Sequence, residues 1–246
     1  MTPPHFIAIE GPVRVGKTSL ARLVAERLRA RLLLDNENNP FLKGFYTVRP
    51  GAAFQAQMFF LIERFRQLKN ASIATSRSPV VADYLFEKDK IFACINLGDE
   101  ELGVYDQYYD LLKEQLPTPD LVIYLQASPE VLRRRIARKD IASEANISDE
   151  YLIEVGKAYE HFFSHYRASD VLVINTTELD FVERSRDLEE LLRGLTQPIK
   201  GTQFFPSRRL GVEPAKVPGN RSLVVNPCGQ GVSSTQRPKS RDHGCP

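Results

Sequence analysis

The chain has few of the features that define several protein classes. Its 246 residues contain three cysteines, and Cys94, Cys228 and Cys245 show no spacing typical of metal or redox sites. No apolar run approaches the roughly 18 residues that a membrane-spanning helix needs. The net charge of +2 is too small to indicate nucleic-acid binding. The N-terminus has no basic region followed by an apolar one, so we expect no signal peptide and a cytoplasmic protein.

Residues 207–246 differ in composition from the rest of the chain. They are rich in Ser, Gly, Pro and Arg and carry seven Lys or Arg residues against two acidic ones. They show no hydrophobic periodicity, and such segments bury too little apolar surface to fold alone. We therefore predict one domain over residues 1–206, followed by a basic, disordered tail over residues 207–246.

The most informative motif lies near the N-terminus. Phe6 to Ile9 form an apolar run that predicts a buried strand, and Leu20 to Leu28 predict a helix. Between them, Gly11 to Thr18 fit the pattern G-x-x-x-x-G-K-[ST] in the context that the motif requires. The N–H groups of such a loop and the dipole of the following helix converge on one point, where they bind polyphosphate.

The motif predicts a binding site for a polyphosphate together with Mg²⁺. Lys17 would reach the outer phosphates, and the Thr18 hydroxyl would ligate Mg²⁺. The residues expected to contact the nucleotide are Gly11, Pro12, Val13, Arg14, Val15, Gly16, Lys17, Thr18 and Ser19.

Strand and helix patterns alternate along the chain. Predicted strands cover residues 6–9, 32–34, 79–83, 120–125 and 171–174, and predicted helices cover residues 20–28, 54–68, 100–116, 151–166 and 188–195, with one more starting at Ser128. This order predicts an α/β fold, a five-stranded parallel sheet with helices on both faces. Ligands of such sheets bind beyond the carboxyl ends of the strands, where Asp35 and Asp83 fall together with the glycine loop.

An ordered set of short motifs resembles the bacterial deoxyadenosine, deoxyguanosine and deoxycytidine kinases, a family of deoxynucleoside kinases. The resemblance spans about residues 5–195. Its residues are Ile9-Glu10-Gly11-Pro12, Gly16-Lys17-Thr18, Asn39-Pro40-Phe41-Leu42, Phe45-Tyr46, Phe54-Gln55, Met58-Phe59-Phe60, Arg64, Ala82-Asp83-Tyr84, Ile91-Phe92-Ala93, Pro119-Asp120-Leu121-Val122-Ile123-Tyr124-Leu125, Arg135-Ile136, Glu144 and Tyr151-Leu152.

The resemblance implies a P-loop kinase fold with a mobile lid. Members of the family are often dimeric, so a homodimer is consistent with the resemblance. It implies transfer of the γ-phosphoryl group of ATP, with Mg²⁺, to the 5′-hydroxyl of a deoxynucleoside in nucleotide salvage. Gln55 would pair with the base, whereas Tyr46 and Glu144 would hold the sugar 3′-hydroxyl. Arg135 would meet the transferred phosphoryl group. No nucleic-acid or membrane partner is implied.

The general base stays open between two carboxylates. The family places a glutamate at the end of the second strand, and that position falls on Leu34. A shift of one residue would let Asp35 take the hydroxyl proton, and Glu37 lies further along the same loop. We favour Asp35 over Glu37.

Other positions also depart from the family pattern. Arg14 stands where relatives often have glycine, so a positive φ there would cost strain. Asp83 is followed by Tyr84 instead of arginine, and Lys88 could supply the missing positive charge to the substrate site. The lid has Lys139-Asp140-Ile141 in place of an Arg-Gly-Arg pattern. Two alternatives stay open. A nucleoside-monophosphate kinase such as a thymidylate kinase shares the loop and the lid, although the Asn39-Pro40-Phe41-Leu42 and Phe54-Gln55 blocks argue against it. The departures at Leu34, at Tyr84 and in the lid favour the other alternative, a kinase-like nucleotide-binding subunit without turnover.

Overall fold

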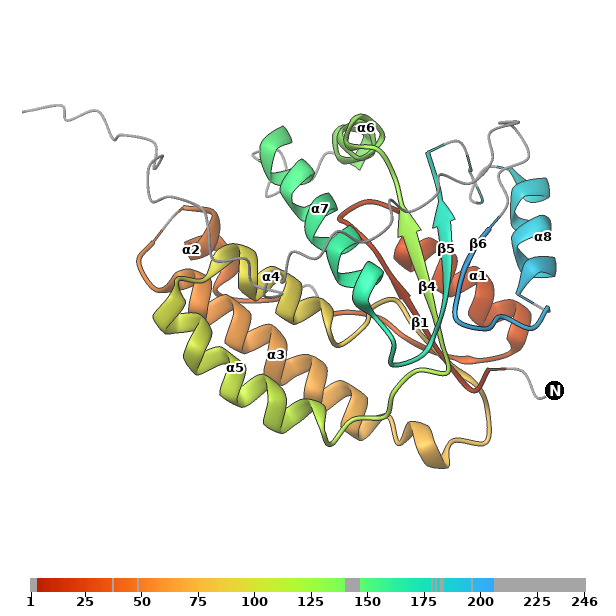
Figure 1. The fold of residues 1–246 in the computed structure, drawn as a ribbon, viewed down its shortest axis with the longest axis horizontal. Coiled ribbons are helices and arrows are strands. Elements are labelled where there is room, and N and C mark those ends of the chain that lie inside the picture. Colours follow the sequence, from red (N-terminus) through yellow and green to blue (C-terminus); the bar gives the residue numbers. More distant parts are fainter. Residues whose placement is uncertain are drawn as a thin grey trace, which may run out of the picture. The chain divides into compact units, whose positions relative to one another are not determined.

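The strands form one parallel sheet, drawn in Figure 1. The structure, a computed structural model, describes residues 4–36, 38–47, 49–139, 147–177, 179, 181, 184–195 and 197–205. Within these residues the sheet has the order β2-β3-β1-β4-β5-β6. The strands are β1 (Phe6–Glu10), β2 (Arg31–Leu33), β3 (Val80–Ala82), β4 (Leu121–Gln126), β5 (Asp170–Asn175) and β6 (Thr202–Phe204). The predicted α/β fold is confirmed.

The prediction of five strands was wrong, because β6 adds a sixth strand at the edge of the sheet. Its three residues, Thr-Gln-Phe, are all exposed and form no apolar run. The strand exists through backbone pairing with β5, in a register that sets Val171 opposite Thr202. Hydrophobic patterning does not report pairing of this kind.

Helices separate the strands along the chain. They are α1 (Lys17–Leu28), α2 (Leu42–Tyr46), α3 (Ala52–Asn70), α4 (Lys88–Asn96), α5 (Asp99–Lys113), α6 (Pro129–Lys139), α7 (Asp149–His165) and α8 (Ser185–Gly194), with a 3₁₀ turn at Ile73–Thr75. The sequence did not predict α2 or α4. Two charged residues that are buried, Lys88 and Asp89, open α4 and mask its apolar period. None of the helices in the described part of the chain has the length and apolarity that a membrane crossing requires.

The core lies on both faces of the sheet. In β1, Ile7 and Ile9 pack with residues of α1, α6 and α8, whereas Phe6 and Ala8 face the side covered by α3, α4, α5 and α7 (Figure 1). All five residues of β1 are buried. The loop after β1 therefore leaves the centre of the sheet between two helical layers, and helix α1 begins there.

Candidate active site

The loop between β1 and α1 has the backbone of a phosphate-binding loop. Gly11 has a φ of 152°, and a Cβ atom there would lie 2.4 Å from the carbonyl oxygen of Leu125. Only glycine fits such a close approach to β4. Gly16, at the start of α1, has a φ of 113°. Arg14 adopts a φ of 58°, the left-handed conformation in which a side chain costs about 1–3 kcal/mol.

Lys17 points back into this loop. Its Nζ donates to the carbonyl oxygens of Gly11 at 2.8 Å and Pro12 at 3.0 Å. Burial, followed by repulsion from Lys88, lowers the pKa of Lys17 from 10.5 to about 8, although Glu10 opposes the shift. An anionic ligand in the loop would relieve this cost, because it would give the ammonium group a counter-charge.

Asp83 joins the phosphate loop to the end of β2. Its carboxylate is buried, and one oxygen accepts from the Thr18 hydroxyl at 2.6 Å. The other oxygen accepts from the backbone N–H of Asp35 at 2.6 Å. Three neighbouring strand ends, after β1, β2 and β3, thereby meet at one point of the carboxyl edge.

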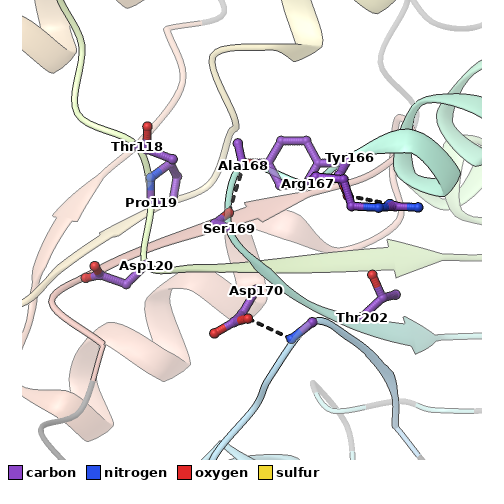
Figure 2. Close-up of a pocket in the computed structure, with 10 residues that line it drawn as sticks. Thr118, Pro119, Asp120, Tyr166, Arg167, Ala168, Ser169, Asp170 and Thr202 are labelled. Atoms are coloured by element: carbon purple, nitrogen blue, oxygen red, sulfur yellow. Dashed lines mark hydrogen bonds between the residues drawn. The ribbon is translucent and has the colours of Figure 1, made fainter.

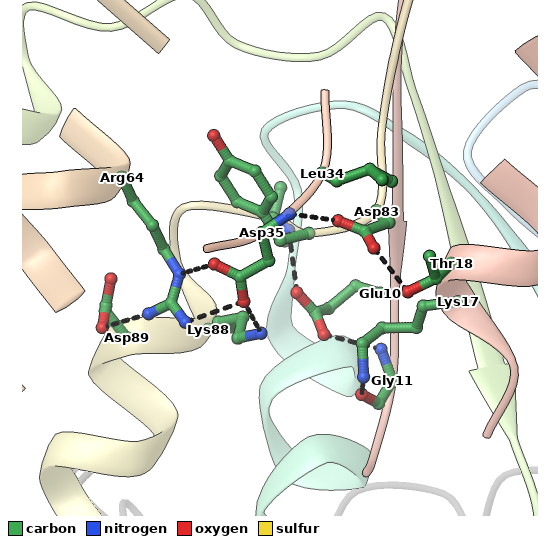
Figure 3. A network of polar contacts seen from close by, with 12 residues as sticks. Glu10, Gly11, Lys17, Thr18, Leu34, Asp35, Arg64, Asp83, Lys88 and Asp89 are labelled. Atoms are coloured by element: carbon green, nitrogen blue, oxygen red, sulfur yellow. Dashed lines mark hydrogen bonds and ion pairs between the residues drawn. The ribbon is translucent and has the colours of Figure 1, made fainter. Parts of the chain in front are cut away.

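Asp35 lies at the centre of a network of buried charges (Figure 3). The Arg64 guanidinium donates to both Asp35 oxygens at 2.9 Å, and Lys88 Nζ donates to Oδ2 at 2.7 Å. Arg64 also donates to Asp89 Oδ1 at 2.6 Å. Lys88 thus contacts the carboxylate that the sequence favoured as the general base.

The two cations change the acidity of Asp35. Burial alone would raise the pKa of its carboxyl group, but Lys88 and Arg64 outweigh burial and hold that pKa well below its usual range. Burial likewise works against the charge on Arg64, yet Asp89 and Asp35 raise the pKa of its guanidinium. Asp35 is therefore a carboxylate at any physiological pH and a strong hydrogen-bond acceptor.

Two of the three glutamines of helix α3, Gln55 and Gln57, lie on different faces of the helix. Positions seven apart on a helix lie within about 20° of each other, whereas positions nine apart lie roughly 180° apart. Gln57 therefore shares the face of Arg64, and Gln55 lies on the opposite face. Gln57 is buried, and its Nε2 has no hydrogen-bond partner among the described residues. Gln55 is exposed, and its Oε1 accepts from Arg49 at 2.8 Å.

The sequence did not single out Gln57 or Asp89 as site residues. Asp89 Oδ2 is also buried without a described partner. A buried polar atom that lacks a partner costs about 1–3 kcal/mol, so both atoms are suited to hydrogen-bond a ligand. The signal in the sequence was the seven-residue spacing from Gln57 to Arg64, which places two polar residues on the face of α3 whose other buried residues are apolar.

The structure describes the other predicted site residues to different extents. The Arg135 guanidinium donates to the Val15 carbonyl at 2.9 Å and to the Thr176 carbonyl at 2.9 Å, so it joins the phosphate loop to the end of β5. Tyr46 ends α2, but its side chain lies outside what the structure describes. Glu37 and Glu144 lie outside the described residues altogether.

A cavity of about 660 Å³ lies at the opposite edge of the sheet (Figure 2). It is lined by Thr118, Pro119, Asp120, Tyr166, Arg167, Ala168, Ser169, Asp170, Gly201 and Thr202. Asp170 accepts from the Gly201 N–H at 2.7 Å, and Arg167 donates to the carbonyl oxygens of Tyr166 and Ser164. The first bond joins the amino ends of β5 and β6, and the Arg167 bonds close the end of α7. The cavity therefore lies at the amino edge of the sheet, opposite the glycine loop, and is not the phosphate site.

The site combines a glycine loop between a central strand and a helix, a lysine and a threonine at the end of that loop, and a buried aspartate after the neighbouring strand. This combination defines a P-loop phosphotransferase. The comparisons specify the family. Residues 7–200 match the deoxynucleoside kinase family, and the chain belongs to it. Members of this family are ATP-dependent phosphotransferases that act on deoxynucleosides.

Individual relatives agree with this assignment. The chain is 34% identical to a deoxyguanosine kinase of Bacillus subtilis (strain 168) over 78% of its length and 96% of the relative. It is 28% identical to a deoxyadenosine/deoxycytidine kinase of the same organism, over 80% of this chain and 94% of that one. A solved structure of a deoxyadenosine kinase from M. mycoides with bound dCTP aligns with a TM-score of 0.64 at 25% identity, over 78% of this chain and 98% of that one.

Proposed function

We propose that this deoxynucleoside kinase transfers the γ-phosphoryl group of ATP to the 5′-hydroxyl of a purine deoxynucleoside, with deoxyguanosine as the preferred acceptor. The observation that carries the proposal is the junction at Asp83, which binds Thr18 of the phosphate loop with one oxygen and the Asp35 backbone with the other. Donor and acceptor groups are therefore adjacent. The identity to a deoxyguanosine kinase supports the choice of base.

Asp35 is proposed to accept the hydrogen bond of the 5′-hydroxyl and to orient its oxygen toward the γ-phosphorus. A loose transition state needs little proton transfer before the phosphoryl group moves, so a carboxylate held by Arg64 and Lys88 can serve as an orienting acceptor. Lys17 would leave the carbonyl oxygens of Gly11 and Pro12 for the β- and γ-phosphates. The Lys88 ammonium, whose Nζ lies 2.7 Å from Asp35 Oδ2, would place positive charge near the transferred phosphoryl group, where negative charge develops.

Magnesium fits the oxygen donors at this junction. The Thr18 hydroxyl lies beside the Asp83 carboxylate, and hydroxyl and carboxylate oxygens suit a hard divalent cation. Among the described residues no group of three His, Cys, Asp or Glu side chains could hold a metal alone. Phosphate oxygens and water would then complete the shell, and the ion would neutralise charge on the transferred group.

The buried face of α3 is proposed to recognise the base. Among the described residues, the donor Gln57 Nε2 on α3 and the acceptor Asp89 Oδ2 on the neighbouring α4 have no hydrogen-bond partner. Guanine offers both complements, an O6 or N7 acceptor and N–H donors. Gln57, and not the exposed Gln55, is therefore our candidate for base pairing. Tyr46 and Glu144 remain proposals for binding of the 3′-hydroxyl.

Steady-state kinetics with Mg·ATP, the four deoxynucleosides and dTMP tests the proposal. We expect deoxyguanosine to give the highest kcat/KM, and Asp35→Asn to lower kcat on the order of 10²-fold with a smaller change in KM. Glu37→Gln is the matched control and should stay close to wild type. Phosphorylation of dTMP alone would indicate a monophosphate kinase, and loss in Glu37→Gln without loss in Asp35→Asn would reverse the assignment of the carboxylate.

A further inference from the structure

Glu10 is a buried carboxylate that the mechanism above does not use. It is the last residue of β1 and is fully buried. Its Oε1 accepts from the Gly11 N–H at 2.8 Å and from the Tyr159 hydroxyl at 3.0 Å. Its Oε2 accepts from the Leu85 N–H at 2.7 Å. One side chain thus contacts the phosphate loop, the segment between β3 and α4, and helix α7.

The two oxygens of this carboxylate lead to the two halves of the active site. On the donor side, the Gly11 carbonyl accepts from Lys17 Nζ at 2.8 Å (Figure 3). On the acceptor side, the Leu85 carbonyl accepts from the Lys88 N–H at 3.1 Å. The Lys88 ammonium in turn holds Asp35 at 2.7 Å.

We propose that Glu10 is a positioning residue that fixes the distance between the phosphate-binding loop and the group that orients the acceptor hydroxyl. Phosphoryl transfer between two bound substrates depends on their in-line approach. An error of 1 Å in such an approach can cost about 10²-fold in rate. The proposal rests on the proposed acceptor site at Asp35 and Lys88.

Two variants separate positioning from general stability. In Glu10→Gln the amide keeps one acceptor oxygen, while its NH₂ group faces a backbone N–H, so the bond to Gly11 or the bond to Leu85 is lost. In Tyr159→Phe both backbone bonds remain. The Tyr159 ring is held by stacking on Tyr124 at 6.1 Å and by an edge contact with Phe92 at 6.2 Å, so this control keeps its packing.

Steady-state kinetics of the folded variants should then show a loss in kcat without a matching rise in KM. For Glu10→Gln we expect kcat to fall about 10- to 100-fold, while KM for ATP and for the nucleoside changes less than about threefold. Tyr159→Phe should keep kcat within about threefold of wild type. The proposal is overturned if Glu10→Gln keeps wild-type kcat, if its KM values rise as much as kcat falls, or if Tyr159→Phe loses as much as Glu10→Gln.

A measurement on the wild-type protein gives an independent answer, whether or not Glu10→Gln folds and whether or not deoxyguanosine is the substrate. In ¹⁵N–¹H spectra, a non-hydrolysable ATP analogue alone should shift the Leu85 amide resonance, and deoxyguanosine alone should shift the Gly11 resonance. Absence of the Leu85 shift on saturation with the ATP analogue overturns the positioning role. Failure of the proposed function is distinguishable, because it abolishes wild-type turnover and leaves the ATP-induced Leu85 shift intact.

Discussion

Replacing Asp35 by asparagine should destabilise the folded protein as well as lower its kcat. The Asp35, Arg64 and Lys88 side chains are only 14%, 6% and 10% exposed, so their charges are poorly solvated. After Asp35→Asn, Arg64 keeps Asp89, but the Lys88 ammonium keeps no other described partner. Leaving one buried charge uncompensated costs about 3–5 kcal/mol.

Thermal unfolding measures this loss. A domain of 150–250 residues shifts its Tm by about 2–4 °C per kcal/mol, so Asp35→Asn should lower Tm by roughly 6–20 °C. Glu63→Gln, which breaks the exposed pair with Arg66 on the same helix, should shift Tm little. The double variant Asp35→Asn, Lys88→Met should recover part of the loss, because it removes the unpaired charge. A Tm for Asp35→Asn within about 2 °C of wild type would refute the reasoning.

The same pair predicts an effect of acid. The pKa of Asp35 is lower in the folded chain than the usual value of about 4 in the unfolded chain. Its contribution is therefore complete above about pH 4 and is lost as the pH falls toward the lowered pKa. In Asp35→Asn, the loss of stability below pH 4 should be smaller than in wild type.

Three further predictions follow from other parts of the molecule. Because the pKa of Lys17 is lowered to about 8, ATP affinity should fall as the pH rises from 7 to 9, with proton uptake on binding near pH 8; calorimetry that shows no pH dependence would contradict this. Gln57→Leu should reduce kcat/KM for deoxyguanosine at least tenfold, whereas Gln55→Leu should not; the reverse order would restore Gln55 as the base-pairing residue. A chain that ends at Pro206 should keep its activity and Tm, and a Tm lower by many degrees would show that residues 207–246 stabilise the domain.

The parts of the site that the sequence predicted well are local. Gly11 to Thr18 lie between a buried strand and a helix, so the motif and its neighbours determine the loop together. Asp83 and Asp35 follow strands, and the parallel sheet brings them to one edge. Tyr84 stands where relatives have an arginine, and the sequence offered Lys88 as the source of that positive charge; the Lys88 ammonium lies against Asp35.

The parts that the sequence missed depend on contacts between distant segments. The apolar residues of α3 predicted its helix, yet Gln57 and Arg64 lie on its buried face. Arg64 is buried because Asp35 and Asp89, from two other elements, neutralise its charge. No periodicity reports such pairing, just as none reported β6.

The most direct test of the account is ³¹P NMR of the reaction of wild type and Lys17→Ala with Mg·ATP and deoxyguanosine. We predict that wild type forms ADP and deoxyguanosine 5′-monophosphate in equal amounts, and that Lys17→Ala, folded as judged by circular dichroism, is slower by several orders of magnitude. A variant within about tenfold of wild type, which is roughly 1.4 kcal/mol of barrier, would contradict the role of the loop. A wild type that forms no 5′-monophosphate from any deoxynucleoside would contradict the function itself.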